Sequence, residues 1–141
     1  MAQRADDTAD VLAGFALFSD LDRPQLEAVA HTLEEEWFSP GQRVLRQGFT
    51  GTGLYFILQG EAAVLIDGRE RARLGRGEFF GEVSVLLGDP PVADIVAASP
   101  LHCLVLAIAD VEPFLTSHPT VMYRMLQTQA RRLRNANLWQ G

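Results

Sequence analysis

The residues best suited to chemistry lie in one short stretch, FFGEVSVLLGDPPVADIVAAS, from Phe79 to Ser99. Gly81 has no side chain, so backbone N–H groups around it can approach an anion closely. The turn that follows, from Glu82 to Leu86, can form a short helix with its positive N-terminal end near that anion. The carboxylate of Glu82 can accept a hydrogen bond from a sugar hydroxyl. The stretch therefore predicts a loop that holds a ligand carrying a phosphate.

Strand patterns surround this stretch. From Glu34 to about Ile108 the sequence alternates short apolar and β-branched runs, such as LYFILQG, EAAVLI and LHCLVLAI, with turn residues. Pro40-Gly41 is a turn signal, and Asp67-Gly68 is a hairpin signal between two strand-like runs. Many short strands at close spacing predict an antiparallel sandwich or roll rather than β-α-β units.

Helical patterns occupy both ends of the chain. Residues 9–33 predict two short helices with a break near residues 19–22, where Asp22 can cap the second helix. A short helix is expected from Asp110, and a longer one from Thr120 to about Leu138. We therefore predict a mainly β (α+β) fold in one domain, 1–141. Its parts are N-terminal helices (1–33), an antiparallel β-roll of jelly-roll type (34–109) that includes the segment 79–97, and C-terminal helices (110–141).

The order of these segments resembles the cyclic-nucleotide-binding domain family, found in bacterial cAMP-responsive regulators, protein kinase A regulatory subunits and nucleotide-gated channels. The resemblance covers nearly the whole chain, through FSDLDRPQLEAVAHTLEEEWFSPGQRVLRQG, GLYFILQGEAAVLI, FFGEVSVLLGDPPVADIVA and HPTVMYRMLQTQARRLR. It implies that residues 79–97 are the phosphate-binding cassette, the segment that holds the cyclic phosphate. Within the cassette, Glu82 matches the residue that binds the ribose hydroxyl.

The second half of the cassette departs from the family pattern, which closes with a run like Pro-Arg-Ala/Ser-Ala-Thr. Here the run is Pro90-Pro91-Val92-Ala93-Asp94. Pro91 stands at the arginine position and has neither a charge nor an N–H donor. Asp94 stands near the hydroxyl position, and an inward carboxylate would oppose an anion. Loss of the arginine alone is expected to weaken binding by roughly two to three decades.

The resemblance assigns the ligand-binding role to six residues and a pocket-lining role to three more. The first group is Gly81, Glu82, Val83, Ser84, Pro91 and Val92, and the second is Phe80, Leu74 and Ala93. A replacement guanidinium from another strand would have to come from Arg69, Arg71, Arg73 or Arg76. Solvated strand and turn arginines are the alternative interpretation of those four.

No pattern predicts an enzyme, a metal site or a cofactor. His31, His102 and His118 are scattered and form no metal-ligand spacing with acidic or cysteine residues, and GEVSVLLG is not a nucleophile elbow. The lone cysteine, Cys103, lies in an apolar run and is expected to be buried and inert. It also excludes an intrachain disulfide.

The distribution of charge along the chain restricts which macromolecules could bind this protein. The net charge is −6, all 12 basic residues are arginine, and residues 34–112 are strongly acidic, which disfavours a nucleic-acid partner.

No apolar run has the length of a membrane span and no signal-peptide pattern is present, so a cytoplasmic location is expected. The acidic run Glu34–Glu36 is expected to face solvent rather than to form a binding patch. The arginines of YRMLQTQARRLRN suit a helix C-terminal end or contact with a partner.

Two functions follow from these observations. The first is a regulatory domain that binds cAMP or cGMP and passes the signal through its C-terminal helix to a partner or a fused effector. The second is a domain of the same fold that has lost the ligand and serves as an interaction or assembly module. In either case, the helix over residues 120–138 would pack on the β-roll or form a homodimer seam. The apolar residues that could serve either purpose are Met122, Met125, Leu126, Leu133 and Leu138. The chain ends without room for a helix-turn-helix, so it is either a protein without that element or an excised domain.

Overall fold

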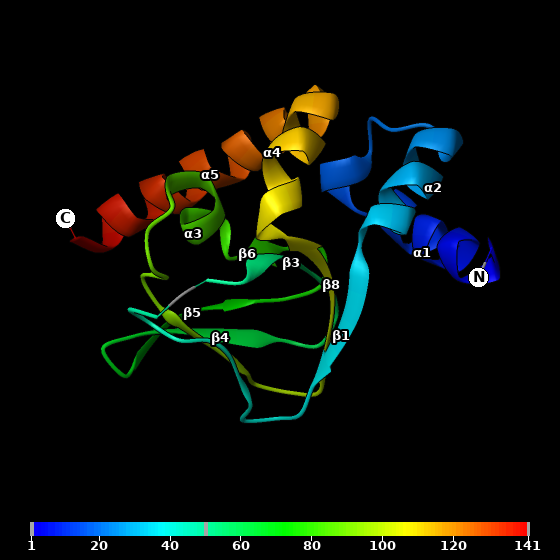
Figure 1. Ribbon diagram of the computed structural model, residues 1–141. Helices are drawn as coiled ribbons and strands as arrows, with labels where there is room; N and C mark the ends of the chain where they lie inside the picture. Colours follow the sequence, from blue (N-terminus) through cyan, green and yellow to red (C-terminus); the bar gives the residue numbers. More distant parts are fainter. Residues whose placement is uncertain (1, 50, 141) are drawn as a thin grey trace. The chain divides into compact units, whose positions relative to one another are not determined.

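A computed structural model describes residues 2–49 and 51–140, and the side chains from residue 7 to residue 136 within them (Figure 1). The chain divides into two compact units. One spans His31–Glu112, and the other contains the chain up to Ala30 and again from Pro113. Each unit is described by itself.

The unit from His31 to Glu112 is an antiparallel β-roll, as the sequence predicts. Within the described residues, one four-stranded sheet has the order β1-β8-β3-β6 and the other the order β2-β7-β4-β5. The strands of the first sheet are β1 (Glu34–Phe38), β8 (Leu101–Ala107), β3 (Gly53–Gln59) and β6 (Phe79–Phe80). Those of the second are β2 (Arg43–Leu45), β7 (Asp94–Ala97), β4 (Ala62–Ile66) and β5 (Arg69–Leu74). The mainly β fold with flanking helices is confirmed.

The inward faces of both sheets form one apolar core. Its buried members are Leu45, Tyr55, Ile57, Ala62, Leu74, Phe80, Ile95, Ala97, Leu101, Cys103 and Val105. The β4–β5 connection turns at Asp67 and Gly68, which both have positive φ values, 53° and 80°. This is the hairpin turn that the Asp-Gly pair predicts, because such turns need left-handed backbone at both positions.

Cys103 is buried in this core, as expected. Burial raises the pKa of its thiol to about 12, with a smaller contribution from the negative charge of Glu36. The thiol is therefore protonated at neutral pH and a poor nucleophile.

The other unit is helical. It contains α1 (Ala2–Ala13), η1 (Ala16–Phe18), most of α2 (Arg23–Thr32), the second half of α4 (Ile108–Ser117) and α5 (Pro119–Gln140). Asp22 caps α2 as predicted: its carboxylate accepts the Gln25 N–H at 3.0 Å, and the Gln25 side chain accepts the Asp22 N–H at 2.9 Å. This reciprocal pair is a capping box, and it fixes the break that the sequence predicts after Phe18.

The long helix α5 has a buried side and an exposed side. Val121 and Met125 are buried, whereas Met122, Leu126 and Leu133 are exposed. The sequence groups Met122, Met125, Leu126 and Leu133 on one packing or dimer surface, but the structure buries Met125 and exposes the other three. The side chain of Leu138 lies outside the described residues.

Candidate ligand-binding site

Gly81 joins β6 to the short helix α3 (Glu82–Leu87) and occupies a backbone conformation that only glycine adopts readily. Its φ is 93°, in the left-handed region. A Cβ atom placed on Gly81 would lie 2.4 Å from the carbonyl oxygen of Gly53. Both the φ value and the close approach to β3 therefore require glycine, and together they fix where α3 begins.

Glu82 is the first residue of α3, and its side chain is buried. A buried carboxylate is unusual in a protein, because ionised groups lose hydration when they leave water. The arrangement places one acidic group directly after the left-handed glycine, at the same end of the β-roll as β6 (Figure 1). This half of the cassette has the local geometry that the sequence predicts.

Ser84 lies in the first turn of α3 and is also buried, with 7 % of its surface exposed. Its Oγ has no hydrogen-bond partner among the described atoms. A Cβ atom placed on Gly51 would lie 2.5 Å from this Oγ and 3.8 Å from Cγ of Pro91. Ser84, Gly51 and Pro91 therefore meet at one point, although they come from three separate segments.

Residues 46–49 of the β2–β3 loop run beside the closing part of the cassette. The Gly48 N–H donates to the Pro91 carbonyl oxygen at 3.0 Å, and the Gln47 N–H donates to Oδ1 of Asp94 at 2.7 Å. The other carboxylate oxygen of Asp94 lies 3.9 Å from Nε of Arg43. Asp94 is thus engaged by residues next to and within β2.

This geometry bears on the role expected for Asp94. The sequence predicts that Asp94 opposes an anion in the cassette if its carboxylate points inward. Instead, the carboxylate is bound by a backbone N–H of Gln47 and lies near the guanidinium of Arg43, which offsets its charge. The expectation of a weakened phosphate site therefore rests on Pro91 rather than on Asp94.

The remaining predicted site residues divide by exposure. Pro91 and Ala93 are buried, and Leu74 and Phe80 belong to the core of the roll. Val83 is partly buried. Val92 is 57 % exposed. The structure brings Gly81, Glu82 and Ser84 into one turn and Pro91 next to it, but Val92 faces solvent.

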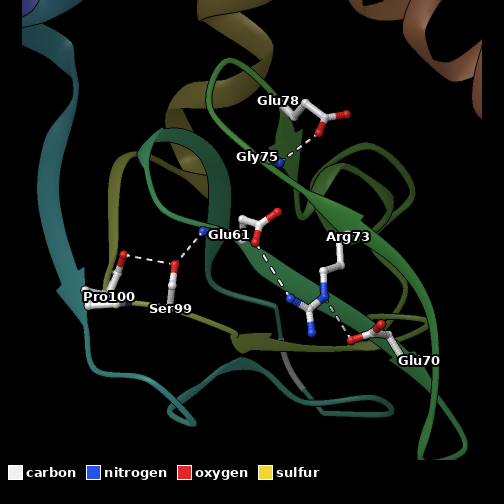
Figure 2. Close-up of polar contacts among 7 residues, drawn as sticks. All are labelled: Glu61, Glu70, Arg73, Gly75, Glu78, Ser99 and Pro100. Carbon is white, nitrogen blue, oxygen red and sulfur yellow. Dashed lines mark hydrogen bonds and ion pairs between the residues drawn. The ribbon is translucent and has the colours of Figure 1, made fainter.

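Two of the four arginines proposed as substitutes make contacts along the strands. Arg73 forms ion pairs with Glu70 at 3.2 Å and with Glu61 at 3.7 Å, as Figure 2 shows. Nearby, Glu78 accepts the Gly75 N–H at 2.8 Å (Figure 2). Arg76 donates to the Leu58 carbonyl oxygen at 3.3 Å. Arg69 and Arg71 are exposed on β5. A replacement guanidinium from this group remains a prediction.

The sequence interpretation missed the contribution of the β2–β3 loop and of the residues that open β3. Thr52 and Tyr55 form a hydroxyl pair at 2.7 Å, and the Tyr55 ring stacks on Phe80 with centroids 4.9 Å apart. Burial raises the pKa of Tyr55, while the hydrogen bond with Thr52 partly opposes that shift. Gly51 and Gly53 of GFTGTG, which make room for Ser84 and for the β8 backbone, were the available signal.

Over the residues that the structure describes, none of the helices combines the length and the apolar character needed to cross a bilayer.

Comparison with known proteins supports the family resemblance. Residues 35–118 match the family "Cyclic nucleotide-binding domain". A cGMP-dependent protein kinase of Eimeria tenella is 31 % identical over 119 residues, which cover 84 % of this chain and 12 % of the kinase. The chain thus spans only a small part of that relative.

Solved structures also match. The catabolite activator protein of Thermus thermophilus superposes with a TM-score of 0.77 at 30 % identity, covering 86 % of this chain and 60 % of that one. The regulatory subunit of a cAMP-independent protein kinase A from Trypanosoma brucei is also similar. Its variant with three substitutions, one of them threonine to arginine, has been solved bound to cAMP. That variant superposes with a TM-score of 0.67 at 26 % identity, covering 89 % of this chain and 52 % of that one.

Proposed function

Since the chain belongs to the cyclic nucleotide-binding domain family, we propose that it is a non-catalytic regulatory domain that binds a cyclic nucleotide weakly. The observation that carries the proposal is the intact first half of the cassette. Gly81 is left-handed and pressed against the Gly53 carbonyl, and a buried Glu82 follows it. This turn supplies a carboxylate for the ribose hydroxyl and backbone close to where a phosphate would lie.

The affinity is low because the second half of the cassette has no guanidinium. Pro91 is buried beside Gly51, and it contributes only its carbonyl oxygen, which already accepts the Gly48 N–H. A charge-assisted hydrogen bond contributes about 1.5–3 kcal/mol, and a two-pronged arginine–phosphate contact contributes more. The Trypanosoma brucei variant solved with cAMP carries a threonine-to-arginine substitution together with two substitutions to alanine, which agrees with this reasoning.

The first test is a calorimetric titration of cAMP and cGMP into the wild type, Pro91→Arg and Pro90→Arg. Pro91→Arg should bind at least about 100-fold more tightly than the wild type, because it restores a guanidinium at the closing position. Pro90→Arg is the matched control, since it makes the same charge change at an adjacent exposed proline. It should stay within about threefold of the wild type, as long-range attraction is screened by salt.

The outcomes of this titration distinguish a ligand-binding domain from an interaction or assembly module. Micromolar binding by the wild type, equal to that of Pro91→Arg, would contradict the claim of weak binding. Failure of all three proteins to bind would contradict the ligand-binding proposal. The domain would then be better described as an interaction or assembly module, for which the exposed side chains of Met122, Leu126 and Leu133 on α5 offer a surface.

The signal would leave the domain through α4 and α5. Helix α4 begins in the β-roll unit and ends in the helical unit, so the two units are joined through its backbone. A ligand that binds one state of the cassette more tightly shifts the population of that state. Amide exchange in α5, measured on Pro91→Arg with and without saturating cAMP, should therefore change. Unchanged exchange would show that binding is not relayed.

A further inference from the structure

We propose that strand β1 is a docking edge for an extended, arginine-bearing segment of another protein, and that Trp37 and Glu35 hold an arginine side chain of that segment. The inference goes beyond the proposed function, since it concerns the part of the sheet formed by β1 and β8 and uses no residue of the cassette. Its outcome therefore does not depend on whether a cyclic nucleotide binds.

The first step is an exposed indole that the protein holds in one orientation. Trp37 has 64 % of its surface exposed. It lies directly opposite His102 in the pairing of β1 with β8, and the two rings stack with centroids 4.5 Å apart and an interplanar angle of 7°. Because the stack already orders the indole, little conformational freedom is lost when a partner covers it. Trp37 is therefore a flat, preorganised surface for a ligand.

The second step is the negative charge beside the indole. Glu35 lies two residues before Trp37, so both side chains are on the same face of β1, and Oε2 of Glu35 is 4.0 Å from Nε2 of His102. Glu34 and Glu36 are exposed on the same strand. The sequence alone favours a solvated run for these glutamates, but the structure adds an aromatic surface next to them. A guanidinium can lie flat on an indole while it bonds a carboxylate, so the combination suits arginine.

The third step is the free edge of the strand. Strand β1 is at one end of its sheet, next to β8, so within the described residues its other side pairs with no strand (Figure 1). An extended segment can add to such an edge through backbone hydrogen bonds. A second copy of this chain is a poor occupant, because pairing β1 with itself would set glutamates against glutamates. A basic segment has the complementary charge, and this selects it as the occupant.

The test is a titration of the full chain, followed by NMR, with a short peptide in which arginine alternates with threonine. Binding should be detectable below about 1 mM, the amide signals of β1 should shift, and those β1 amides that do not bond to β8 should exchange more slowly. The same peptide with lysine should bind several-fold more weakly, because an ammonium group does not match the flat, two-pronged contact. The same peptide with glutamate should not bind.

Three results of this titration would overturn the inference. They are no binding of the arginine peptide at about 1 mM, equal affinity for the lysine or the glutamate peptide, and amide shifts confined to elements other than β1 and β8.

Variants of the two contact residues test the assignment. Trp37→Ala should weaken binding of the arginine peptide by about tenfold or more, and Glu35→Gln by about threefold or more. Trp37→Phe keeps a smaller ring and should fall between the wild type and Trp37→Ala. Tyr123→Ala on α5 is the matched control, because Tyr123 is exposed to nearly the same degree, 62 %, and it should bind the peptide as the wild type does.

The melting temperature of each variant, measured without peptide, separates the loss of a contact from the loss of the fold. Trp37→Phe and Glu35→Gln keep the test decisive if Trp37→Ala does not fold. If the folded variants of Trp37 and Glu35 bind the peptide as tightly as the wild type, or if Tyr123→Ala loses as much affinity as they do, the inference is wrong, whatever the cyclic-nucleotide titration shows.

Discussion

At the scale of single residues, the cassette depends on two left-handed glycines that differ in one respect. Gly81 and Gly88 bracket α3 with φ values of 93° and 75°. A Cβ on Gly81 would lie 2.4 Å from the Gly53 carbonyl oxygen, whereas one on Gly88 meets no described atom within 4 Å. Substituting alanine at each of the two glycines therefore distinguishes the cost of a left-handed backbone from the additional cost of a steric collision.

Gly88→Ala should lower the free energy of unfolding by about 1–2 kcal/mol, the cost of a left-handed backbone for a residue with a Cβ. Gly81→Ala should cost roughly 1–3 kcal/mol more, because β3 or α3 must also move to relieve the collision. Urea unfolding of both variants and the wild type measures the difference. If the two substitutions cost the same, the contact between Gly81 and Gly53 does not constrain the cassette.

At the scale of elements, the β2–β3 loop fastens the end of the cassette to the β4–β5 hairpin. Gln47 donates its backbone N–H to Asp94 at 2.7 Å. Its side chain accepts the Asp67 N–H at 3.0 Å and donates to Oδ1 of Asp67 at 3.1 Å. One glutamine thus joins three segments, and the cassette is held at this end by the protein itself.

Asp94→Ala should remove this connection. We expect the free energy of unfolding to fall by about 1–2 kcal/mol and the amides of Gln47 and Gly48 to exchange faster, because the N–H of Gln47 loses its acceptor. Asp94→Asn is the matched control, since its side-chain oxygen can still accept that N–H, and it should resemble the wild type. Unchanged exchange in Asp94→Ala would show that the contact does not order the loop.

This connection also bears on the repair of the phosphate site. Adding Asp94→Thr to Pro91→Arg should not tighten cyclic-nucleotide binding beyond Pro91→Arg alone, because the Asp94 carboxylate is engaged by Gln47 and Arg43.

The elements also show how far sequence reasoning reaches. The Asp67-Gly68 turn, the Asp22 cap and the start of α3 after Gly81 could be predicted, because each depends on residues close together in the chain. The role of Asp94 could not, since its partner Gln47 is 47 residues away and a backbone N–H leaves no trace in the sequence. The unpaired hydroxyl of Ser84 was hidden for the same reason: only the folded chain brings Gly51 and Pro91 to it.

At the scale of the whole molecule, two points far apart in the chain meet in the helical unit. Arg124 on α5 binds Asp20, which follows η1, through two contacts: Nε to Oδ2 at 2.5 Å and Nη2 to Oδ1 at 3.1 Å. The hydrogen bond from Arg124, followed by its charge, lowers the pKa of Asp20 below its ordinary value, although partial burial opposes the shift. The contact closes the helical unit across 104 residues of sequence.

This pair makes the stability of the protein depend on pH in a defined direction. Because the pKa of Asp20 is lower in the folded protein than in the unfolded chain, the stabilisation is complete above the unfolded value of about 3.9 and is lost as the pH falls through the folded value. Lowering the pH from about 7 to about 2 should therefore reduce the melting temperature of the wild type more than that of Asp20→Asn, which has no carboxylate to protonate.

Arg124→Ala should show the same reduced dependence of the melting temperature on pH, and combining the two substitutions should reduce that dependence no further. Asp89→Asn, which removes an exposed carboxylate from the cassette turn, is the control for the loss of one acid. If Asp20→Asn loses as much stability at low pH as the wild type, the Asp20–Arg124 pair does not help to hold α5 in the helical unit.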